Sequence, residues 1–174
     1  MSSKILFLYD KLMTKEEQTK IGIDLDFIGY GVANAKLYFF NDDKKRRLFI
    51  NPVKGGSIEL VYGGIYKLDN YETNKHKLHS YYNNSIPFTG FSFREDIYVP
   101  ENIKVEPIIF HSLEEIEKCT YQRLDSIECF CFVGNLQNKK IQHSLSRGKY
   151  YRRFSVDARN FIKLVGERNG SKIL

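Results

Sequence analysis

Near its N-terminus the chain reads Ile5-Leu6-Phe7-Leu8-Tyr9-Asp10-Lys11-Leu12-Met13. The apolar first half is typical of a buried strand, and the polar residues after Tyr9 are typical of a tight turn. A strand that ends in such a turn leaves backbone N–H groups without sheet partners, and these amides can bind a carboxylate or a developing oxyanion. The alternative is a plain strand-to-helix turn that Asp10 caps.

The composition indicates a single soluble globular domain. The chain has 174 residues, of which 42% are hydrophobic and 28% charged, and this length is enough for one sizeable core. Aromatic residues make up 14% of the chain, with 12 Tyr, 13 Phe and no Trp. Aromatic side chains are enriched in strands, so the composition favours a β-rich fold.

The sequence also argues against a membrane partner, a disulfide framework, a metal and a cofactor. No apolar run approaches the roughly 20 residues that span a bilayer, and the N-terminal stretch lacks a signal-peptide pattern. We therefore expect a cytoplasmic protein with no membrane partner. The cysteines Cys119, Cys129 and Cys131 are too few for a disulfide framework and are predicted to be structural thiols. The four histidines show no metal-ligand spacing, so we expect no metal and no cofactor.

The formal net charge of +6 draws on two basic clusters, Lys44-Lys45-Arg46-Arg47 and Tyr150-Tyr151-Arg152-Arg153. Basic residues beside aromatic residues can hold phosphates and stack bases. However, the first cluster follows Asn41-Asp42-Asp43 in a predicted hairpin turn, where solvated charge is expected. The pattern argues against nucleic-acid binding, although an interaction module built on the second cluster stays as an alternative.

The order of predicted elements favours an α+β fold, a small mixed β-barrel with peripheral helices, because strands predominate and βαβ alternation is rare. Capping-box patterns open two of the helices, at Thr14 and at Ser112, and a third helix is amphipathic. The predicted strands are 5–9, 27–40, 46–50, 58–68, a hairpin of 91–99 and 103–110 around Pro100-Glu101-Asn102, and 127–133. The predicted helices follow Thr14 as far as Gly22, span 70–82, follow Ser112, and span 158–165.

This order resembles the gamma-glutamylcyclotransferase-like family. Members open with a strand ending in a Tyr-Gly-x-Leu turn, and Tyr9-Asp10-Lys11-Leu12 is similar to it. A later strand of the form Val-x-Gly-x-x-Tyr is matched by Val61-Tyr62-Gly63-Gly64-Ile65-Tyr66, and a Gly-rich strand between them by Phe27-Ile28-Gly29-Tyr30-Gly31. The resemblance covers roughly residues 4 to 110. It implies one domain, 1–174, with a family-like barrel core over 1–110, and it assigns no role to 111–174.

The resemblance implies a reaction class, the cyclisation of a γ-glutamyl amine or peptide that releases 5-oxoproline. The substrate would be a small γ-glutamyl compound held by Tyr9, Asp10, Lys11 and Leu12. Asp10 stands where the family has Gly, which allows positive φ and close approach of a ligand. Asp tolerates left-handed geometry, but its carboxylate would repel an anionic substrate, an effect that Lys11 would offset.

The acid/base is the point of departure. In the family, a glutamate near the end of the helix after the Val-x-Gly strand takes the proton from the substrate ammonium, which cannot attack a carbonyl while protonated. By position, Tyr82 stands in its place, and a phenol with a pKa near 10 is a poor base. By literal match to the family motif, Glu72 is the candidate acid/base. Its alternative role is that of a favourable dipole partner in the first turn of the helix. His79 is a third candidate for the acid/base, because imidazole titrates near neutral pH. The competing hypothesis is a degenerate member that binds without catalysing.

Overall fold

The computed structural model describes residues 2–42, 45–53, 59–83, 96–118 and 120–146. Within these residues the strands are β1 (Lys4–Leu8), β2 (Asp26–Asp42), β3 (Lys45–Pro52), β4 (Leu60–Leu68), β5 (Tyr98–Ile109), β6 (Gln122–Arg123) and β7 (Ile127–Gly134). The helices are the 3-10 turn η1 (Lys11–Met13), α1 (Lys15–Ile21), α2 (Tyr71–Asn83), α3 (Leu113–Lys118) and α4 (Lys139–Ser146).

The sheet closes into a barrel. Its strand order is β3-β2-β4-β1-β7-β5-β6, and an additional pairing of β2 with β5 joins the two sides. The closed part is a mixed barrel of the five strands β2, β4, β1, β7 and β5, in which only the β1–β7 pair is parallel. The predicted small mixed β-barrel with peripheral helices is confirmed. Since β7 is a barrel strand, the barrel extends past residue 110.

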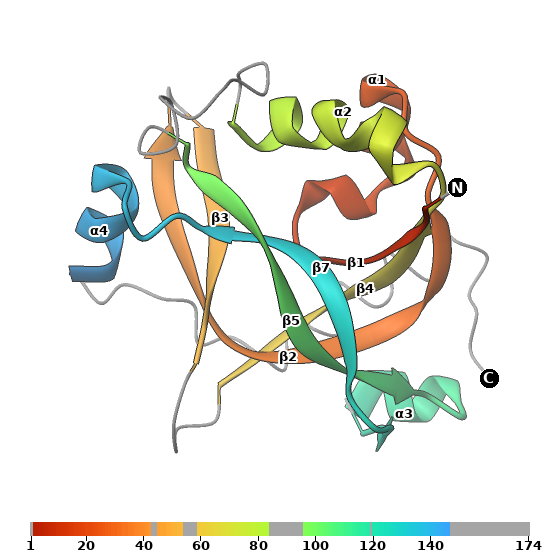
Figure 1. The fold of residues 1–174 in the computed structure, drawn as a ribbon. Coiled ribbons are helices and arrows are strands. Elements are labelled where there is room, and N and C mark those ends of the chain that lie inside the picture. Colours follow the sequence, from red (N-terminus) through yellow and green to blue (C-terminus); the bar gives the residue numbers. More distant parts are fainter. Residues whose placement is uncertain (1, 43–44, 54–58, 84–95, 119, 147–174) are drawn as a thin grey trace.

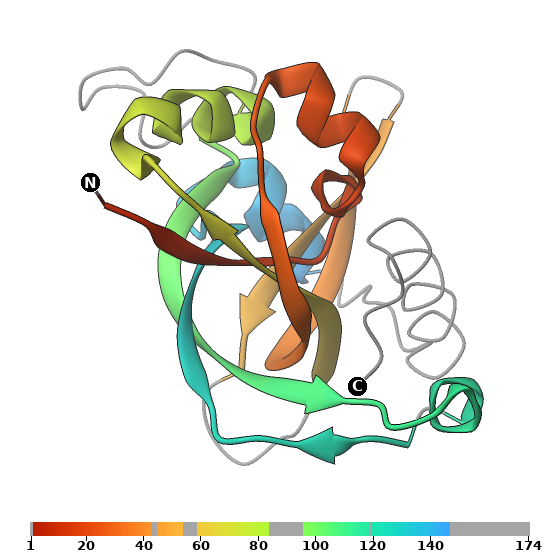
Figure 2. The same cartoon turned by 90° about the vertical axis from the view of Figure 1, so that its right-hand side faces the viewer.

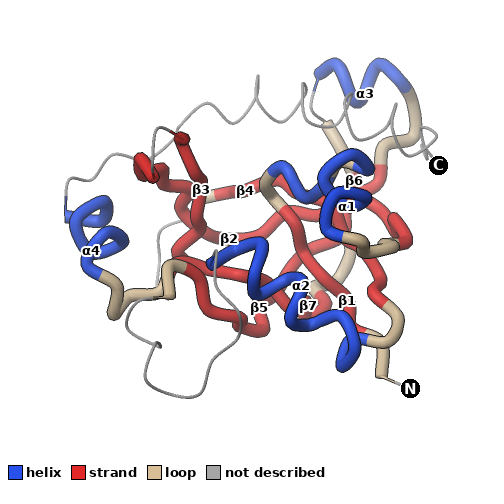
Figure 3. Tube along the Cα trace, turned by 90° about the horizontal axis from the view of Figure 1, so that it is seen from above, coloured by secondary structure: helices blue, strands red, loops and turns tan. Residues whose placement is uncertain are grey.

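The helices lie at the ends and sides of this barrel. Figures 1 and 2 show α1 and α2 side by side over one end, with α3 beyond the opposite end. From above, α1 and α2 lie over the barrel strands (Figure 3). Helix α4 packs against β2. The end covered by α1 and α2 is also the end where the chain leaves β1 and turns into η1.

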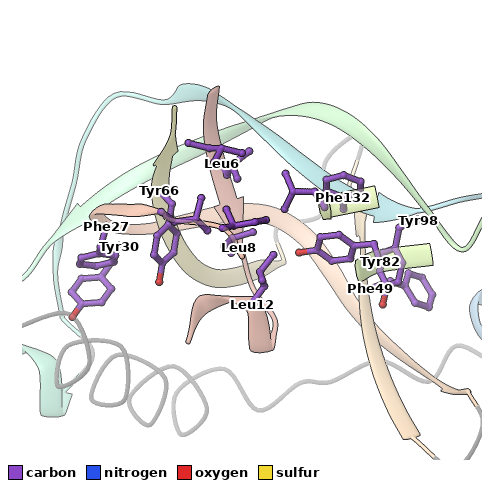
Figure 4. Close-up of a cluster of buried hydrophobic side chains, with 14 of the residues drawn as sticks. Leu6, Leu8, Leu12, Phe27, Tyr30, Phe49, Tyr66, Tyr82, Tyr98 and Phe132 are labelled. Carbon is purple, nitrogen blue, oxygen red and sulfur yellow. The ribbon is translucent and has the colours of Figure 1, made fainter. Parts of the chain in front are cut away.

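Two clusters of buried side chains form the core. The first takes residues from all five barrel strands at alternate positions, so it fills the barrel interior. The second lies between the barrel and the helices, and Figure 4 shows part of it; it joins Leu6 and Leu8 of β1 to Leu12, Leu78 and Tyr82. The first cluster comprises Phe7, Tyr9, Ala33, Ala35, Ile50, Val61, Ile65, Ile103, Val105, Cys129, Cys131 and Val133.

Local signals in the sequence place several elements correctly. The Thr14 hydroxyl accepts a hydrogen bond from the Glu17 N–H at 3.3 Å, and Gly22 ends α1 in left-handed geometry with φ of 71°. The predicted long bent strand is the 17-residue β2, whose register shifts where Ile28 is an extra residue. The second capping box, at Ser112, is also present. The helix predicted over 158–165 lies outside the described residues.

The predicted hairpin around Pro100 is wrong. Strand β5 continues through Pro100-Glu101-Asn102, and these residues pair in unbroken register with Phe132, Cys131 and Phe130 of β7. Proline and polar residues are tolerated there because all three are exposed. The turn signal is therefore overridden by pairing with a strand that lies about 30 residues further along the chain, as tertiary context overrides local propensity.

We predict that Gly63→Ala destabilises the barrel by about 1–3 kcal/mol, the usual cost of overpacking. A Cβ at Gly63 would lie 2.4 Å from the Leu8 carbonyl oxygen and 2.5 Å from the Phe7 ring, so β1 would have to move. Urea unfolding measures the loss. Gly29→Ala is the matched control in β2, because a Cβ there meets nothing within 4 Å. Equal losses in the two variants would contradict this account of β1 and β4.

Candidate functional site

The turn after β1 is closed by its own hydrogen bonds. Asp10 caps η1, and its Oδ1 accepts the Leu12 N–H at 3.1 Å. The Met13 N–H donates to the Asp10 carbonyl and the Thr14 N–H to the Lys11 carbonyl. Asp10 has φ of −119°, so the turn needs no left-handed residue at this position. The amides of three successive residues are thus bonded within the turn, as the capped-turn alternative describes.

Tyr9 anchors the turn to two neighbouring strands. Its hydroxyl donates to the Phe132 carbonyl of β7 at 2.7 Å and accepts from the Ile50 N–H of β3. Burial raises the pKa of Tyr9 well above the ordinary phenol value. The hydroxyl therefore stays protonated and acts as a structural tie that fixes where Asp10 stands.

Tyr82 reaches the turn from the last helical turn of α2. Its side chain is 1% exposed, stacks on Phe132 with ring centroids 4.4 Å apart, and tilts against Tyr98 at 5.1 Å. These three rings gather at one end of the cluster in Figure 4. The Tyr82 hydroxyl serves as a hydrogen-bond donor to the Asp10 carboxylate. Burial raises the pKa of Tyr82, so Tyr82 is a donor at neutral pH and not a base.

Asp10 brings a carboxylate to this place. The side chain is half-buried, and desolvation raises its pKa from 3.8 to about 6. The Leu12 N–H, the Tyr82 hydroxyl and the positive charge of Arg47 each favour the ionised form and so limit that rise. A carboxyl with a pKa close to the working pH can both take and return a proton, which is the property of a general acid/base.

Arg47 lies at the same site, on β3. Its guanidinium carbon is 4.9 Å from the centroid of the Tyr98 ring, and its Nη2 donates to the Tyr81 carbonyl at 3.5 Å, near the end of α2. The expectation of a solvated basic cluster is therefore wrong for Arg47, which is half-buried. The missed signal is strand alternation, which puts Arg47 on the same face as the fully buried Phe49.

The structure places Glu72 away from this site. Glu72 lies in the first turn of α2, where its exposed carboxylate accepts a hydrogen bond from Lys75 at 2.7 Å and Lys75 lowers its pKa. Ten residues of helix, about 15 Å, separate it from Tyr82. The third candidate, His79, has its Nε2 3.2 Å from Asp96. The site thus joins Tyr9, Asp10 and Tyr82, and leaves Glu72 outside.

Other chemical features are limited. Within the described ranges, no group of three or more metal-ligating side chains comes together, and no described helix is long and apolar enough to cross a membrane. Cys129 and Cys131 are buried free thiols, as predicted for structural cysteines. Cys119 and the basic cluster at 150–153 lie outside the described residues.

Comparison with known proteins bears on the fold. No protein-family model matches the sequence, and no curated protein matches it. Among solved structures, a gamma-glutamyl cyclotransferase superposes with a TM-score of 0.54 at 15% identity, covering 98% of this chain and 82% of that one. An AIG2-like protein from Mus musculus gives 0.51 at 15% identity, with 87% of each chain covered.

A protein from Homo sapiens described as uncharacterized gives a TM-score of 0.53, again at 15% identity, over 99% of this chain and 83% of its own. Identities this low show a shared fold and not a shared activity. The chain has the gamma-glutamylcyclotransferase-like fold, in agreement with the resemblance carried by its turn and its Val-x-Gly strand.

Proposed function

We propose that this protein cyclises a γ-glutamyl amine or peptide and releases 5-oxoproline, with Asp10 as the acid/base. The observation that carries the proposal is the contact between Asp10 and Tyr82. Tyr82 occupies the position at which the resemblance places the family's glutamate, and a carboxylate does stand beside it. That carboxylate comes from the turn after β1 instead of from helix α2.

The reaction needs one group that moves a proton twice. Asp10 takes a proton from the substrate's α-ammonium, and the free amine attacks the γ-carbonyl carbon to form a five-membered ring. The amide C–N bond then breaks as the protonated Asp10 returns its proton to the departing nitrogen. The ring nitrogen gives up its remaining extra proton to the released amine, which leaves as an ammonium. The products are 5-oxoproline and the free amine or peptide, and Asp10 ends ionised, as it began.

The neighbouring residues support this role. The Tyr82 hydroxyl remains protonated and donates to the carboxylate, which orients it. Tyr9 and Leu12 are buried beside Asp10 and hold the turn, while Lys11 is exposed and supplies a positive charge near the substrate. We also propose a cytoplasmic location, supported by the buried free thiols of Cys129 and Cys131, which a reducing compartment preserves.

A second candidate is a small-molecule binding protein without catalysis. It is favoured by the amides of Leu12, Met13 and Thr14, which are bonded within the turn. A turn whose donors are engaged offers less stabilisation to a developing oxyanion. The two candidates differ in whether 5-oxoproline forms, and the assay below decides between them.

Incubation with a panel of γ-glutamyl amines and γ-glutamyl dipeptides should release 5-oxoproline, measured by mass spectrometry. Asp10→Asn should lower kcat/KM by about 10²–10⁴-fold, the usual contribution of an acid/base. Glu72→Gln is the matched control and should retain the wild-type rate, because its carboxylate is exposed and paired with Lys75. A rate that survives in Asp10→Asn, or falls in Glu72→Gln, would place the base elsewhere. Binding without product would favour the second candidate.

The raised pKa of Asp10 also predicts a pH-dependent stability. The folded pKa of about 6 exceeds the ordinary aspartate pKa of 3.8, so the folded state binds this proton more tightly, and stability falls as pH rises from about 4 to 6. The ionised carboxylate costs at most about 3 kcal/mol above that range.

Asp10→Asn removes this cost and keeps an oxygen for the Leu12 N–H. We expect the variant to be more stable than the wild type at pH 7.5, by about 1–3 kcal/mol, and to lose this advantage at pH 4. Urea unfolding at the two pH values measures the difference. An equal difference at both would show that Asp10 has an ordinary pKa.

A further inference from the structure

We propose that Arg47 binds the α-carboxylate of the substrate, so that the site selects compounds with a free α-amino acid end. Asp10 takes the α-ammonium and Arg47 takes the α-carboxylate. This inference rests on the proposed function and narrows its substrate class, because the α-carbon of a γ-glutamyl group bears both the ammonium and the carboxylate.

The first reason is the state of the turn. The amides of Leu12 and Met13 are bonded to the side chain and the carbonyl of Asp10. A substrate carboxylate that met the Leu12 amide would have to displace the Asp10 carboxylate, and one that met the Met13 amide would have to break a backbone hydrogen bond of the turn. In either place it would be repelled by the charge of Asp10. The carboxylate therefore needs a donor outside the turn, with a positive charge to offset Asp10.

Arg47 is such a donor, and it is already held in place. The guanidinium carbon lies over the Tyr98 ring, and the bond to the Tyr81 carbonyl ties one nitrogen to the end of α2. A guanidinium carries five N–H donors in a planar fork that matches the two oxygens of a carboxylate. A fork held in place by these contacts loses less side-chain freedom when an anion binds.

The opposite charge of Asp10 lies nearby. Arg47 lies over Tyr98, Tyr98 packs against Tyr82, and Tyr82 donates to Asp10. The positive charge of Arg47 is close enough to favour the ionised form of Asp10. Arg47, Asp10 and Tyr81 are half-buried, whereas the neighbouring side chains of Tyr82 and Tyr98 are almost fully buried. Two opposite charges in one place, those of Asp10 and Arg47, can bind the ammonium and the carboxylate of a zwitterion.

Binding, measured apart from turnover, tests the inference. L-Methionine sulfone is zwitterionic, carries a sulfonyl group in place of the γ-amide, and cannot cyclise; its α-methyl ester lacks the carboxylate charge. Isothermal titration should show that the wild type binds the acid at least ~10-fold more tightly than the ester, as expected for charge-assisted hydrogen bonds.

Arg47→Gln should abolish this preference, because it should weaken binding of the free acid and leave binding of the ester unchanged. Arg47→Lys keeps the positive charge but loses the planar guanidinium, so it should retain part of the preference. Arg123→Gln is the control for loss of one arginine, because Arg123 lies on β6 and pairs with Glu106. Thermal unfolding checks that each variant is folded.

Equal affinity of the wild type for acid and ester would overturn the inference, as would equal weakening of both ligands in Arg47→Gln, which indicates a purely structural tie. Absence of binding to either compound at millimolar concentration would also overturn it. Preference for the acid without release of 5-oxoproline would refute the proposed reaction and support Arg47. Release of 5-oxoproline without that preference would support the proposed reaction and refute the role of Arg47.

Discussion

The site depends on where β1 ends. This strand lies between β4 and β7, antiparallel to β4 and parallel to β7. Its last residue, Leu8, pairs with Gly64 of β4, and Leu6 pairs with Phe130 of β7. Gly63 lets the Leu8 carbonyl approach β4 closely, and the Tyr9 hydroxyl bonds to the carbonyl of Phe132. The next residue, Asp10, has little freedom to stand anywhere but at this end of the barrel, where α2 delivers Tyr82.

The residues at that point suggest an exchange of groups. The family pattern has Gly on the turn and a carboxylate on the helix, whereas this chain has Asp10 on the turn and Tyr82 on the helix. The carboxylate therefore comes from the turn after β1 in this chain, and from the helix in the family pattern. Such an exchange changes which group feels the low dielectric of the barrel end, and burial raises the pKa of Asp10 to about 6.

The sequence predicted elements whose signals are local. Helix caps at Thr14 and Gly22 satisfy backbone groups within a few residues of the cap. A short apolar run such as Ile5–Leu8 is itself typical of a buried strand. The features that it missed depend on contacts between distant segments. Pro100 lies within a strand because β7 pairs with it. Arg47 is half-buried because Tyr98 and Tyr81 meet it. Period and propensity carry no information about such partners.

The central claim is that Asp10 is the site's ionisable carboxylate and that Tyr82 controls it. A titration of the Asp10 carboxyl carbon by NMR tests this most directly, in the wild type and in Tyr82→Phe. We expect a pKa of about 6 in the wild type and a higher pKa in the variant, because loss of the Tyr82 donor disfavours the ionised form of Asp10. A wild-type pKa near 4, unchanged by Tyr82→Phe, would contradict it.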